Sequence, residues 1–579
     1  MELNKKLNLV ASKFLSAAVL KLYPDAKFAG TEAIDSGFRS IFKFPDTVKL
    51  SINDFSKIKK EIDRLLSSTQ IIRFEKMSLE KLIARYKDNK FYQWYLRAYK
   101  SDPVSVIRIG DFVSPCDDLG GDKLPNGKFL TLKSVGGFYW QGDVNSEKLV
   151  AIDGWVVANE KDFTEYKAIL QDREERDHRR IGSALDLFTF DPLIGQGQPI
   201  WLESGFATKY EIEKYCYELL RRNDYHFIET PILGTTDLYK TSGHWEHYRE
   251  NMFTPFKVDN EEFVLKPMNC PHEIMVYKQK PHSYRELPYR IAEFGIQHRY
   301  ESSGSLTGLE RVRSMKLVDT HEVLMHSQIK KEIKRIYEII LEAHKTLGTS
   351  IYSVDLSLHD PKDTKKFFDN PKMWKNAEDG LRGALKALKV PYKEMVGEAA
   401  FYGPKIDLQI KTALGHIVTV STIQLDFLLP ERFDMTYINE KGEKQRPVFI
   451  HAGIIGTFER YIAILLEQTK GVLPLWLSPI QIIIIPVNNE IHGKFANKLK
   501  QKLVKLGFRA KLDDSDNRLG YKIRSAQTRK IPYQIVIGDN ELKSATKEIT
   551  YRQYGKTDEV KMPVSKFISM IKKQIKEHK

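Results

Sequence analysis

The chain has 579 residues, a formal net charge of +15 and a pI of about 9.2. At roughly 100–200 residues per domain, this length excludes a single packed core and predicts three or four domains. Three cysteines far apart in sequence exclude a disulfide framework, and no apolar run reaches the roughly 20 residues that span a bilayer. We therefore expect a cytosolic protein. Its basic balance fits a nucleic-acid partner and, about equally well, a lysine-rich surface without one.

The first 157 residues mix a helix, predicted over residues 7–22, with short strands and glycine-rich turns. Lys13 interrupts the apolar stretch of this helix and no small-residue cleavage site follows, so it does not read as a signal peptide. Residues 158–182 are highly charged at helical spacing, which predicts a solvated linking helix.

Residues 183–475 form the largest predicted unit. A helix over residues 206–222 opens it and a helix over residues 457–468 closes it. Strands are expected between them near residues 226–233, 262–266, 290–297, 316–321, 406–411, 417–422 and 448–451. This irregular succession of strands and helices indicates an α+β domain with a mixed or antiparallel sheet.

Residues 476–579 predict a small α/β domain. The strand at residues 480–486 is continuously apolar, as in strands buried on both faces, and Gly507 is a stop signal for the preceding helix. The remaining elements are expected at residues 494–506 (helix), 508–512 (strand), 521–529 (helix) and 533–537 (strand).

Two segments are suited to binding phosphate. Residues 297–313 (QHRYESSGSLTGLERVR) place two arginine clusters on either side of a Gly/Ser/Thr loop, and residues 456–460 (GTFER) open a helix. Arginine's planar fork suits phosphate and carboxylate, and helix N-termini stabilise anions. Each signal is weak by itself, because arginines beside a surface hairpin are common.

Taken in order, these segments are similar to a known family. ETPIL (229–233), RYE (299–301) and GTFER resemble motifs 1, 2 and 3 of the class II aminoacyl-tRNA synthetases. The intervening text resembles threonyl-tRNA synthetases: SGHW (242–245), KPMNCP (266–271), FYGPKID (401–407), STIQLDF (421–427) and PVFIH (447–451). The resemblance covers nearly the whole chain. It implies an α+β multidomain enzyme with an antiparallel-sheet class II catalytic core.

The resemblance also implies the division into domains and the partners. We expect an editing-like α+β domain at residues 1–157, a linker helix at 158–182, the catalytic domain at 183–475 and an anticodon-binding α/β domain at 476–579. The partners would be ATP with Mg²⁺, threonine and tRNA(Thr). The enzyme would be a homodimer through motif 1, with no membrane partner.

The family's nucleotide contacts fall on four residues. Arg299 would hold the α-phosphate and the activated carboxylate, and Glu301 would read the adenine amino group. Arg311 would bind the outer phosphates and Arg460 the γ-phosphate. Arg299 and Arg460 would be catalytic, since activation depends on positioning and on neutralising charge at phosphorus.

The family binds one zinc ion per subunit through a cysteine and two histidines, which here match Cys270, His321 and His451. Three protein ligands leave one tetrahedral position open. In the family this position takes the substrate's amino group and hydroxyl. A site that must ligate a hydroxyl rejects valine well but not serine.

Further pocket residues carry over from the family. Asp319 matches the carboxylate that contacts the substrate ammonium, and other lining positions match Tyr402, Lys405 and Gln424. The chain also departs from the family's pattern: Leu317 replaces a pocket glutamine, and the cysteine is followed by PHE (271–273) instead of Pro-Gly-His, which leaves Glu273 unexplained. The usual Arg-Ala after the last histidine is Ala452-Gly453. We expect activity with altered substrate affinity.

The N-terminal segment resembles the family's editing domain through LYPD (22–25), GFYWQGD (137–143) and DHRR (177–180). Its hydrolytic site normally combines a His-x3-His helix with a Cys-x3-His loop. Here Leu9 and Lys13 take the helix positions, and Gly120 replaces the histidine that follows Cys116. No histidine precedes His178, so we expect that editing of Ser-tRNA is lost. The family's preceding β-grasp domain is not expected either.

The C-terminal segment resembles the anticodon-binding domain through NRLGYKIR (517–524) and IPYQIVIGD (531–539). Candidate tRNA contacts, each equally compatible with a solvated basic face, are Lys522, Arg524, Arg529 and Arg552. Lys543 replaces an acidic anticodon reader, so recognition is expected to differ in detail.

Two alternatives stay open. One is a synthetase for another amino acid, such as proline or serine, which the Cys/His/His set disfavours. The other is a non-catalytic RNA-binding paralogue, which the retention of Arg299 and Arg460 disfavours.

Overall fold

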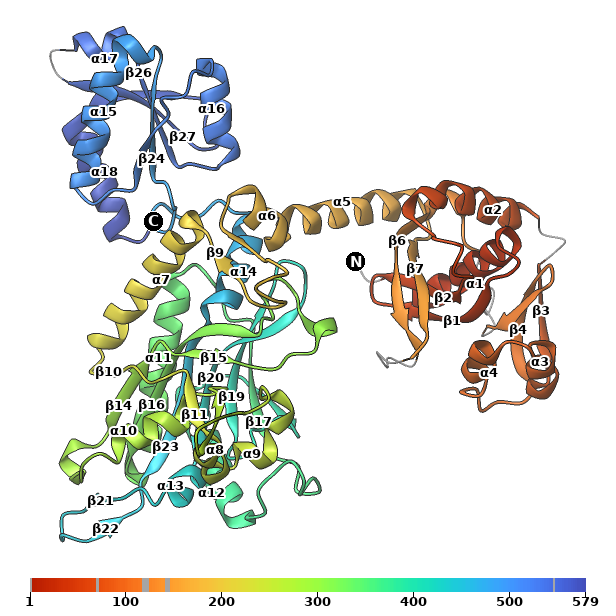
Figure 1. Ribbon diagram of the computed structural model, residues 1–579, viewed down its shortest axis with the longest axis horizontal. Coiled ribbons are helices and arrows are strands. Elements are labelled where there is room, and N and C mark those ends of the chain that lie inside the picture. Colours follow the sequence, from red (N-terminus) through yellow and green to blue (C-terminus); the bar gives the residue numbers. More distant parts are fainter. Residues whose placement is uncertain (1–2, 69–71, 117–123, 141–145, 545–546) are drawn as a thin grey trace. The chain divides into compact units, whose positions relative to one another are not determined.

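The computed structural model describes residues 3–68, 72–116, 124–140, 146–544 and 547–579. The chain forms two compact units, Met1–Asp172 and Arg173–Lys579, whose elements are labelled in Figure 1.

The first unit packs helix α1 (Lys5–Leu22) on a four-stranded sheet in the order β1-β2-β7-β6. The Asn4 side chain caps α1, and every residue from Val10 to Val19 is buried, so the helix is covered on all sides there. The sheet consists of β1 (Lys27–Ile34), β2 (Gly37–Lys43), β6 (Leu130–Tyr139) and β7 (Lys148–Val156). A second sheet and three helices complete the unit: β3 (Ile72–Met77), β4 (Val104–Ile109), β5 (Phe112–Pro115), α2 (Phe55–Ser67), α3 (Leu79–Arg85) and α4 (Lys90–Leu96).

The segment predicted as one solvated linking helix is two helices. α5 (Glu160–Arg176) ends before Asp177, whose side chain accepts a hydrogen bond from the Arg179 backbone and caps α6 (His178–Ala184). The prediction is wrong for α6, because His178 and Ile181 are buried against α14 (Phe458–Thr469). Charge spacing alone did not reveal this covered face.

The second unit contains a nine-stranded sheet in the order β10-β14-β16-β23-β20-β19-β17-β18, with β15 paired to β16. Pairing is antiparallel except at the two ends, which confirms the predicted antiparallel core. The strands are β10 (His226–Phe227), β14 (Tyr289–Glu293), β15 (Ile296–His298), β16 (Ser314–Leu324), β17 (Ser353–Leu358), β18 (Lys393–Val396), β19 (Lys405–Lys411), β20 (Ile417–Asp426) and β23 (Val448–Thr457).

Helices α11 (Ile329–Thr346), α12 (Pro371–Leu388) and α14 contact this sheet and build its main core, which leaves the other face for a site. The sequence reading missed α11 and α12. The strand expected at residues 226–233 is two short strands that belong to different sheets. The remaining elements around the sheet are α7 (Glu203–Arg221), α8 (Thr236–Ser242), α9 (His244–His247), α10 (Cys270–Tyr277), α13 (Leu428–Arg432), β8 (Phe188–Thr189), β9 (Ile200–Trp201), β11 (Leu233–Thr235), β12 (Phe256–Val258), β13 (Glu261–Leu265), β21 (Tyr437–Ile438) and β22 (Lys444–Gln445).

The C-terminal part of this unit has its own five-stranded sheet in the order β25-β24-β26-β27-β28, parallel for the first three strands and antiparallel beyond them. The predicted strand at residues 480–486 is β24 (Ile482–Pro486), whose residues are all buried. The other elements are β25 (Ala510–Leu512), β26 (Tyr533–Ile537), β27 (Glu548–Gln553), β28 (Glu559–Pro563), α15 (Asn489–Lys505), α16 (Leu519–Thr528), α17 (Asp539–Lys543) and α18 (Val564–Lys576).

Among the described residues, no helix is long and apolar enough to cross a membrane.

Two helical glycines give a matched stability test. A Cβ at Gly205, in the first turn of α7, would lie 1.9 Å from the carbonyl oxygen of Leu187, whereas a Cβ at Gly493 in α15 would meet nothing within 4 Å. We expect Gly205→Ala to lower the apparent melting temperature by several degrees, because backbone must move. Gly493→Ala should stabilise its domain by about 0.5–1 kcal/mol, because alanine restricts the unfolded chain. Calorimetry measures both, and a Gly205→Ala protein that melts like the parent would contradict the packing of α7.

Candidate active site

Strand register brings the predicted pocket residues together. His321 on β16 lies directly opposite His451 on β23, His451 opposite Gln424 on β20, and Gln424 opposite Lys405 on β19. Directly opposed residues project from the same face of a sheet. Four predicted residues therefore form one row across four strands.

A second row on the same face of the sheet is displaced from the first by two residues along each strand. It contains Asp319, Gly453, Thr422 and Asp407, again one from each strand. Gly453 has no side chain, so the backbone of β23 leaves space between the Asp319 carboxylate and the Thr422 hydroxyl. The departure from the family's Arg-Ala at residues 452–453 thus lies at the floor of the site.

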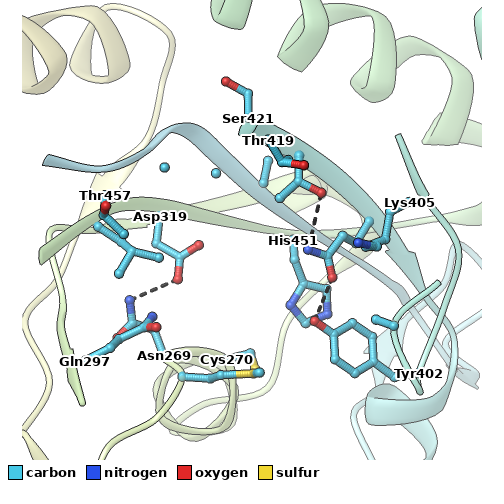
Figure 2. A pocket seen from close by; sticks show the side chains of 18 of the residues that line it. Asn269, Cys270, Gln297, Asp319, Tyr402, Lys405, Thr419, Ser421, His451 and Thr457 are labelled. Atoms are coloured by element: carbon cyan, nitrogen blue, oxygen red, sulfur yellow. Dashed lines mark hydrogen bonds between the residues drawn. The ribbon is translucent and has the colours of Figure 1, made fainter. Parts of the chain in front are cut away.

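A cavity of about 440 Å³ opens on this face, and Figure 2 shows part of its lining. Nine of the predicted residues line it: Cys270, Arg299, Asp319, His321, Tyr402, Lys405, Gln424, His451 and Arg460. Leu317, which stands where the family has glutamine, lines it too. The two remaining predictions, Glu301 and Arg311, do not line the cavity; they pair with each other at 2.8 Å on the neighbouring loop.

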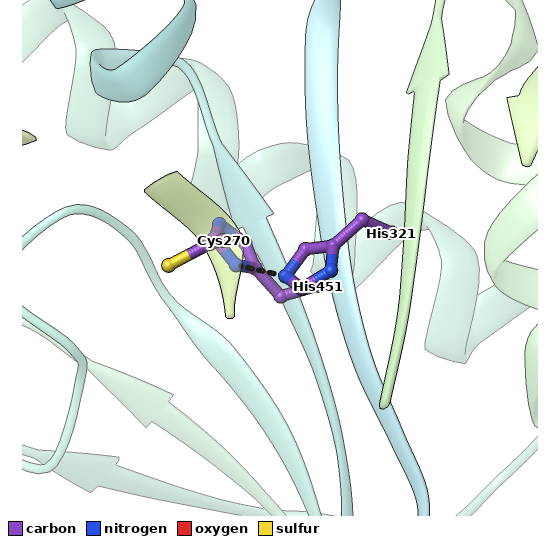
Figure 3. A group of neighbouring side chains, drawn as sticks. All are labelled: Cys270, His321 and His451. Atoms are coloured by element: carbon purple, nitrogen blue, oxygen red, sulfur yellow. Dashed lines mark hydrogen bonds between the residues drawn. The ribbon is translucent and has the colours of Figure 1, made fainter. Parts of the chain in front are cut away.

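Cys270, His321 and His451 meet at one point of the cavity (Figure 3). Their ligand atoms all lie within 4.8 Å of one another, and His321 Nε2 is 3.0 Å from His451 Nδ1. Cys270 is the first residue of α10, where the helix dipole favours a negatively charged sulfur.

Each histidine turns its other nitrogen toward a buried carboxyl group. His321 Nδ1 lies 2.8 Å from Glu273 Oε2, and His451 Nε2 lies 2.9 Å from Asp426 Oδ2. A cation at the two inner nitrogens requires protons on the two outer ones, and Glu273 and Asp426 are placed to accept them. Glu273, unexplained from sequence, therefore has a structural partner.

The electrostatics of the triad fit a metal ion. Burial lowers the pKa of His321 and His451, which keeps both imidazoles neutral and able to ligate. Burial raises the pKa of the Cys270 thiol and of Glu273, and raises the pKa of Asp426 to about 8. A dication among them would lower these pKa values, because it favours nearby negative charge. One sulfur and two imidazole nitrogens are ligands typical of zinc.

Polar side chains beside the triad are held by one another. The Tyr402 hydroxyl donates to Gln424 Oε1 at 2.7 Å, and the Tyr402 ring stacks on His451 with centroids 4.7 Å apart. Asn269 Nδ2 donates to Asp319 Oδ2 at 2.9 Å, and burial raises the pKa of Asp319 to about 6. Hydrogen bonds among the polar side chains of the pocket thus hold them in place.

The two predicted catalytic arginines also line the cavity. Arg299 donates to the Pro267 carbonyl at 3.2 Å and to Gln297 Oε1 at 3.0 Å. Arg460 donates to the Glu310 carbonyl at 3.1 Å, and burial together with the nearby Arg299 lowers the pKa of Arg460. Two guanidinium groups that line one cavity can bind an anion there.

Several residues of the site were not predicted as such, notably Asn269, Gln297, Thr422 and Asp426. Strand alternation could have found two of them. Thr422, Gln424 and Asp426 share one face of β20 because side chains alternate along a strand. Asn269 and Gln297 lie outside such a repeat, and the sequence gives no comparable signal for them.

The predicted tRNA contacts in the C-terminal part divide into two kinds. Lys522 is 3% exposed and its ammonium donates to the Asp513 carbonyl at 3.2 Å, so its prediction as a surface contact is wrong. Arg524, Arg529 and Lys543 are exposed, and Arg552 pairs with Glu559.

The predicted editing positions lie in the first unit. Lys13 is fully buried and its Nζ donates to Thr31 Oγ1 at 2.5 Å. Leu9 is partly buried and Cys116 is buried. Gly120 lies outside the described residues.

Comparison with known proteins identifies the domains. The model of the tRNA synthetase class II core domain (G, H, P, S and T) matches residues 253–469, and the anticodon binding domain matches residues 481–574. A threonine–tRNA ligase of Ureaplasma parvum serovar 3 is 46% identical over 574 residues, which cover 99% of each chain. The corresponding ligase of Staphylococcus carnosus is 44% identical, covering 96% of this chain and 85% of the relative.

Solved structures agree. The RNA binding domain of threonyl-tRNA synthetase from Cryptosporidium parvum Iowa II matches with a TM-score of 0.65 and 36% identity, covering 69% of this chain and 98% of that one. Prolyl-tRNA synthetase from Cryptosporidium parvum, at 17% identity and a TM-score of 0.53 over 69% of this chain and 75% of that one, shares the fold alone. Near full-length identity to the threonine enzymes, on a class II core with an anticodon-binding domain, leads to one conclusion: this chain belongs to the threonyl-tRNA synthetase family, the aminoacyl-tRNA synthetases that ligate threonine to tRNA.

Proposed function

We propose that this enzyme selects threonine through a zinc ion bound by Cys270, His321 and His451. The observation that carries the proposal is the convergence of these three ligand atoms on the cavity that Arg299 and Arg460 also line. When bound there, Zn²⁺ supplies a Lewis-acidic position for the amino group and hydroxyl of threonine.

Neighbouring side chains complete the selection. Asp319 accepts the substrate ammonium, and its hydrogen bond from Asn269 fixes the carboxylate for that contact. Gln424 and Tyr402 turn polar atoms toward the cavity. Valine, which lacks the hydroxyl, would leave such buried polar groups unpaired and is rejected, whereas serine is not.

The arginines carry the nucleotide chemistry. Arg299 and Arg460 bind and neutralise the phosphates of ATP, which enters with Mg²⁺, while the threonine carboxylate is held for in-line attack on the α-phosphorus. Glu301 and Arg311 pair on the loop beside the cavity, and a half-exposed pair contributes little stability. Nucleotide binding can therefore separate them, with Glu301 reading the adenine and Arg311 the outer phosphates.

We assign catalysis to residues 183–475 and tRNA anticodon binding to residues 476–579, where Arg524, Arg529 and Arg552 remain candidate contacts. Residues 158–182 link this pair to the domain at residues 1–157.

We also propose a homodimer through motif 1. Helix α7, which precedes the motif 1 segment at residues 229–233, exposes the large aromatic residues Phe206, Tyr210 and Tyr217, and Leu193 in the loop before α7 is 98% exposed. Phe206 and Tyr210 stack with ring centroids 6.1 Å apart. Apolar side chains gathered on one helix are typical of an interface between copies.

The N-terminal domain, we propose, no longer hydrolyses Ser-tRNA. A lysine ammonium offers only donors, so Lys13 cannot accept a proton from water as an imidazole does. Its hydrogen bond to Thr31 and its position 5.7 Å from the Tyr95 ring place it within the packed interior of the unit. Residues 1–177 contain no histidine, so no other imidazole in this domain can take over that role.

Cys270→Ala tests the zinc assignment. We expect the purified parent protein to hold one zinc per subunit and the variant to lose it. Threonine-dependent ATP–pyrophosphate exchange should fall by more than about 100-fold, because losing a metal ligand lowers activity at least as much as losing a residue that hydrogen-bonds to a ligand. Elemental analysis and the exchange assay measure the two. Cys216→Ala is the matched control, since Cys216 is fully buried in α7 and does not line the cavity. Full activity of metal-free enzyme would refute the proposal.

Glu273 gives a finer test of the same site. Glu273→Leu removes the acceptor for His321 Nδ1–H, and we expect zinc affinity, measured by chelator competition, to fall roughly 10- to 100-fold. Glu273→Gln keeps an acceptor oxygen of the same reach and should bind zinc nearly as the parent does. If the leucine variant keeps the parent affinity, Glu273 does not orient His321.

Loss of editing predicts that Ser-tRNA(Thr) incubated with the enzyme hydrolyses no faster than without it, as followed by release of labelled serine. Acceleration would contradict the proposal. In that case Cys116→Ala identifies the site of hydrolysis: hydrolysis that depends on the Cys116 thiol would be lost in this variant, and hydrolysis at any other site would remain.

A further inference from the structure

His178, the first residue of α6, lies between two parts of the nucleotide site without lining the cavity itself. Its side chain is 2% exposed and stacks on Phe188. On one side it contacts Glu467 near the end of the motif 3 helix α14, and on the other it contacts the loop that carries Glu301 and Arg311.

The two hydrogen bonds fix which imidazole nitrogen is protonated. The backbone N–H of Leu309 donates to His178 Nε2 at 3.1 Å, and a backbone amide can only donate, so Nε2 carries a lone pair. The proton of the neutral ring is then on Nδ1, which donates to Glu467 Oε1 at 2.8 Å. The two ring nitrogens therefore have separate tasks, one toward the helix and one toward the loop.

The loop is shaped to admit the ring. A tight turn joins Thr307 to Arg311, with the Glu310 amide donating to the Thr307 carbonyl at 2.9 Å. Gly308 in this turn has a φ of +48°, and a Cβ there would lie 2.3 Å from His178 Nε2. Only glycine combines this backbone conformation with room for the imidazole.

The same turn also holds a catalytic arginine. The carbonyl of Glu310, one residue after Leu309, accepts the hydrogen bond from Arg460 Nε at 3.1 Å. Arg311 follows directly. One short turn thus connects His178 to both arginines that are proposed to contact the outer phosphates of ATP.

We propose that His178 is a positioning residue for ATP: by accepting the Leu309 amide it fixes the turn that places Arg311 and the Glu310 carbonyl that orients Arg460. The inference rests on the proposed nucleotide site. It assigns the Nε2 side of the ring to nucleotide binding and the Nδ1 side to anchoring on α14.

Two substitutions separate these tasks. The amide nitrogen of asparagine takes the place of Nδ1, so His178→Asn keeps the donor to Glu467 and loses the acceptor for Leu309. The amide oxygen of glutamine takes the place of Nε2, so His178→Gln keeps the acceptor for Leu309 and loses the donor to Glu467. We expect His178→Asn to raise the KM for ATP in threonine-dependent exchange on the order of 10-fold, with the KM for threonine unchanged. His178→Gln should keep the KM for ATP within about 2-fold and instead lower the melting temperature.

Hydrogen–deuterium exchange gives a readout independent of activity. The segment 303–313 should take up deuterium faster in His178→Asn than in His178→Gln, because only the former leaves the Leu309 amide without its acceptor. His282 supplies the control: it is 2% exposed and bonds to Glu286 and the Tyr277 carbonyl, away from the loop. Its Asn and Gln variants should not differ in the KM for ATP or in uptake by residues 303–313.

The reverse order, with His178→Gln the worse variant for ATP, would overturn the inference and assign His178 to anchoring alone. Equal effects of the two variants on the KM for ATP and on uptake by the segment would overturn it too. A parent enzyme without threonine-dependent exchange would refute the proposed function instead, and the exchange of residues 303–313 would still decide what His178 does.

Discussion

The direct opposition of His321 and His451 across two central strands is the constraint on which the rest of the site depends. The nearest nitrogens of these two buried imidazoles are 3.0 Å apart, so they share either a hydrogen bond or a common ligand. The Cys270 sulfur approaches from the start of a helix, and Glu273 and Asp426 hold the outer nitrogens. A cation at the centre, as proposed, would give all five groups a partner.

The sheet supplies the geometry that this constraint needs. Pairing in register sets the row of His321, His451, Gln424 and Lys405 without any loop, so the spacing of the site is as rigid as the sheet. The proposed nucleotide site differs, because its arginines lie at the start of a helix and on a loop. The positions of these arginines therefore depend on individual hydrogen bonds, such as that from Arg460 to the Glu310 carbonyl.

Much of the fold could be predicted from sequence, and less of the site. The strands predicted at residues 480–486, 533–537 and 406–411 agree closely with β24, β26 and β19, whereas the strand predicted at 417–422 is four residues shorter than β20, which ends at Asp426. Continuous apolar runs reveal buried strands directly, because every residue of such a strand is covered. The three proposed metal ligands could be named only through resemblance to a family, since they are far apart in sequence and meet only after strands pair. Lys522 was wrongly predicted to contact tRNA, because the sequence of a helix does not show whether the ammonium of a basic residue points to solvent or to a neighbouring carbonyl. Nothing in the sequence explained Glu273 at this position, whereas in the structure its carboxyl group pairs with Nδ1 of His321.

The order of the three ligands along the chain has a consequence for how the enzyme is made. Cys270 and His321 emerge from the ribosome well before His451, which lies on β23, the strand between β16 and β20. Until that strand has been synthesised, the nascent chain has neither the third ligand nor the centre of its largest sheet, and both are completed by the same ten residues, Val448–Thr457. Capture of the proposed zinc ion and closure of the largest sheet therefore both wait for these ten residues, and a chain released before them has neither.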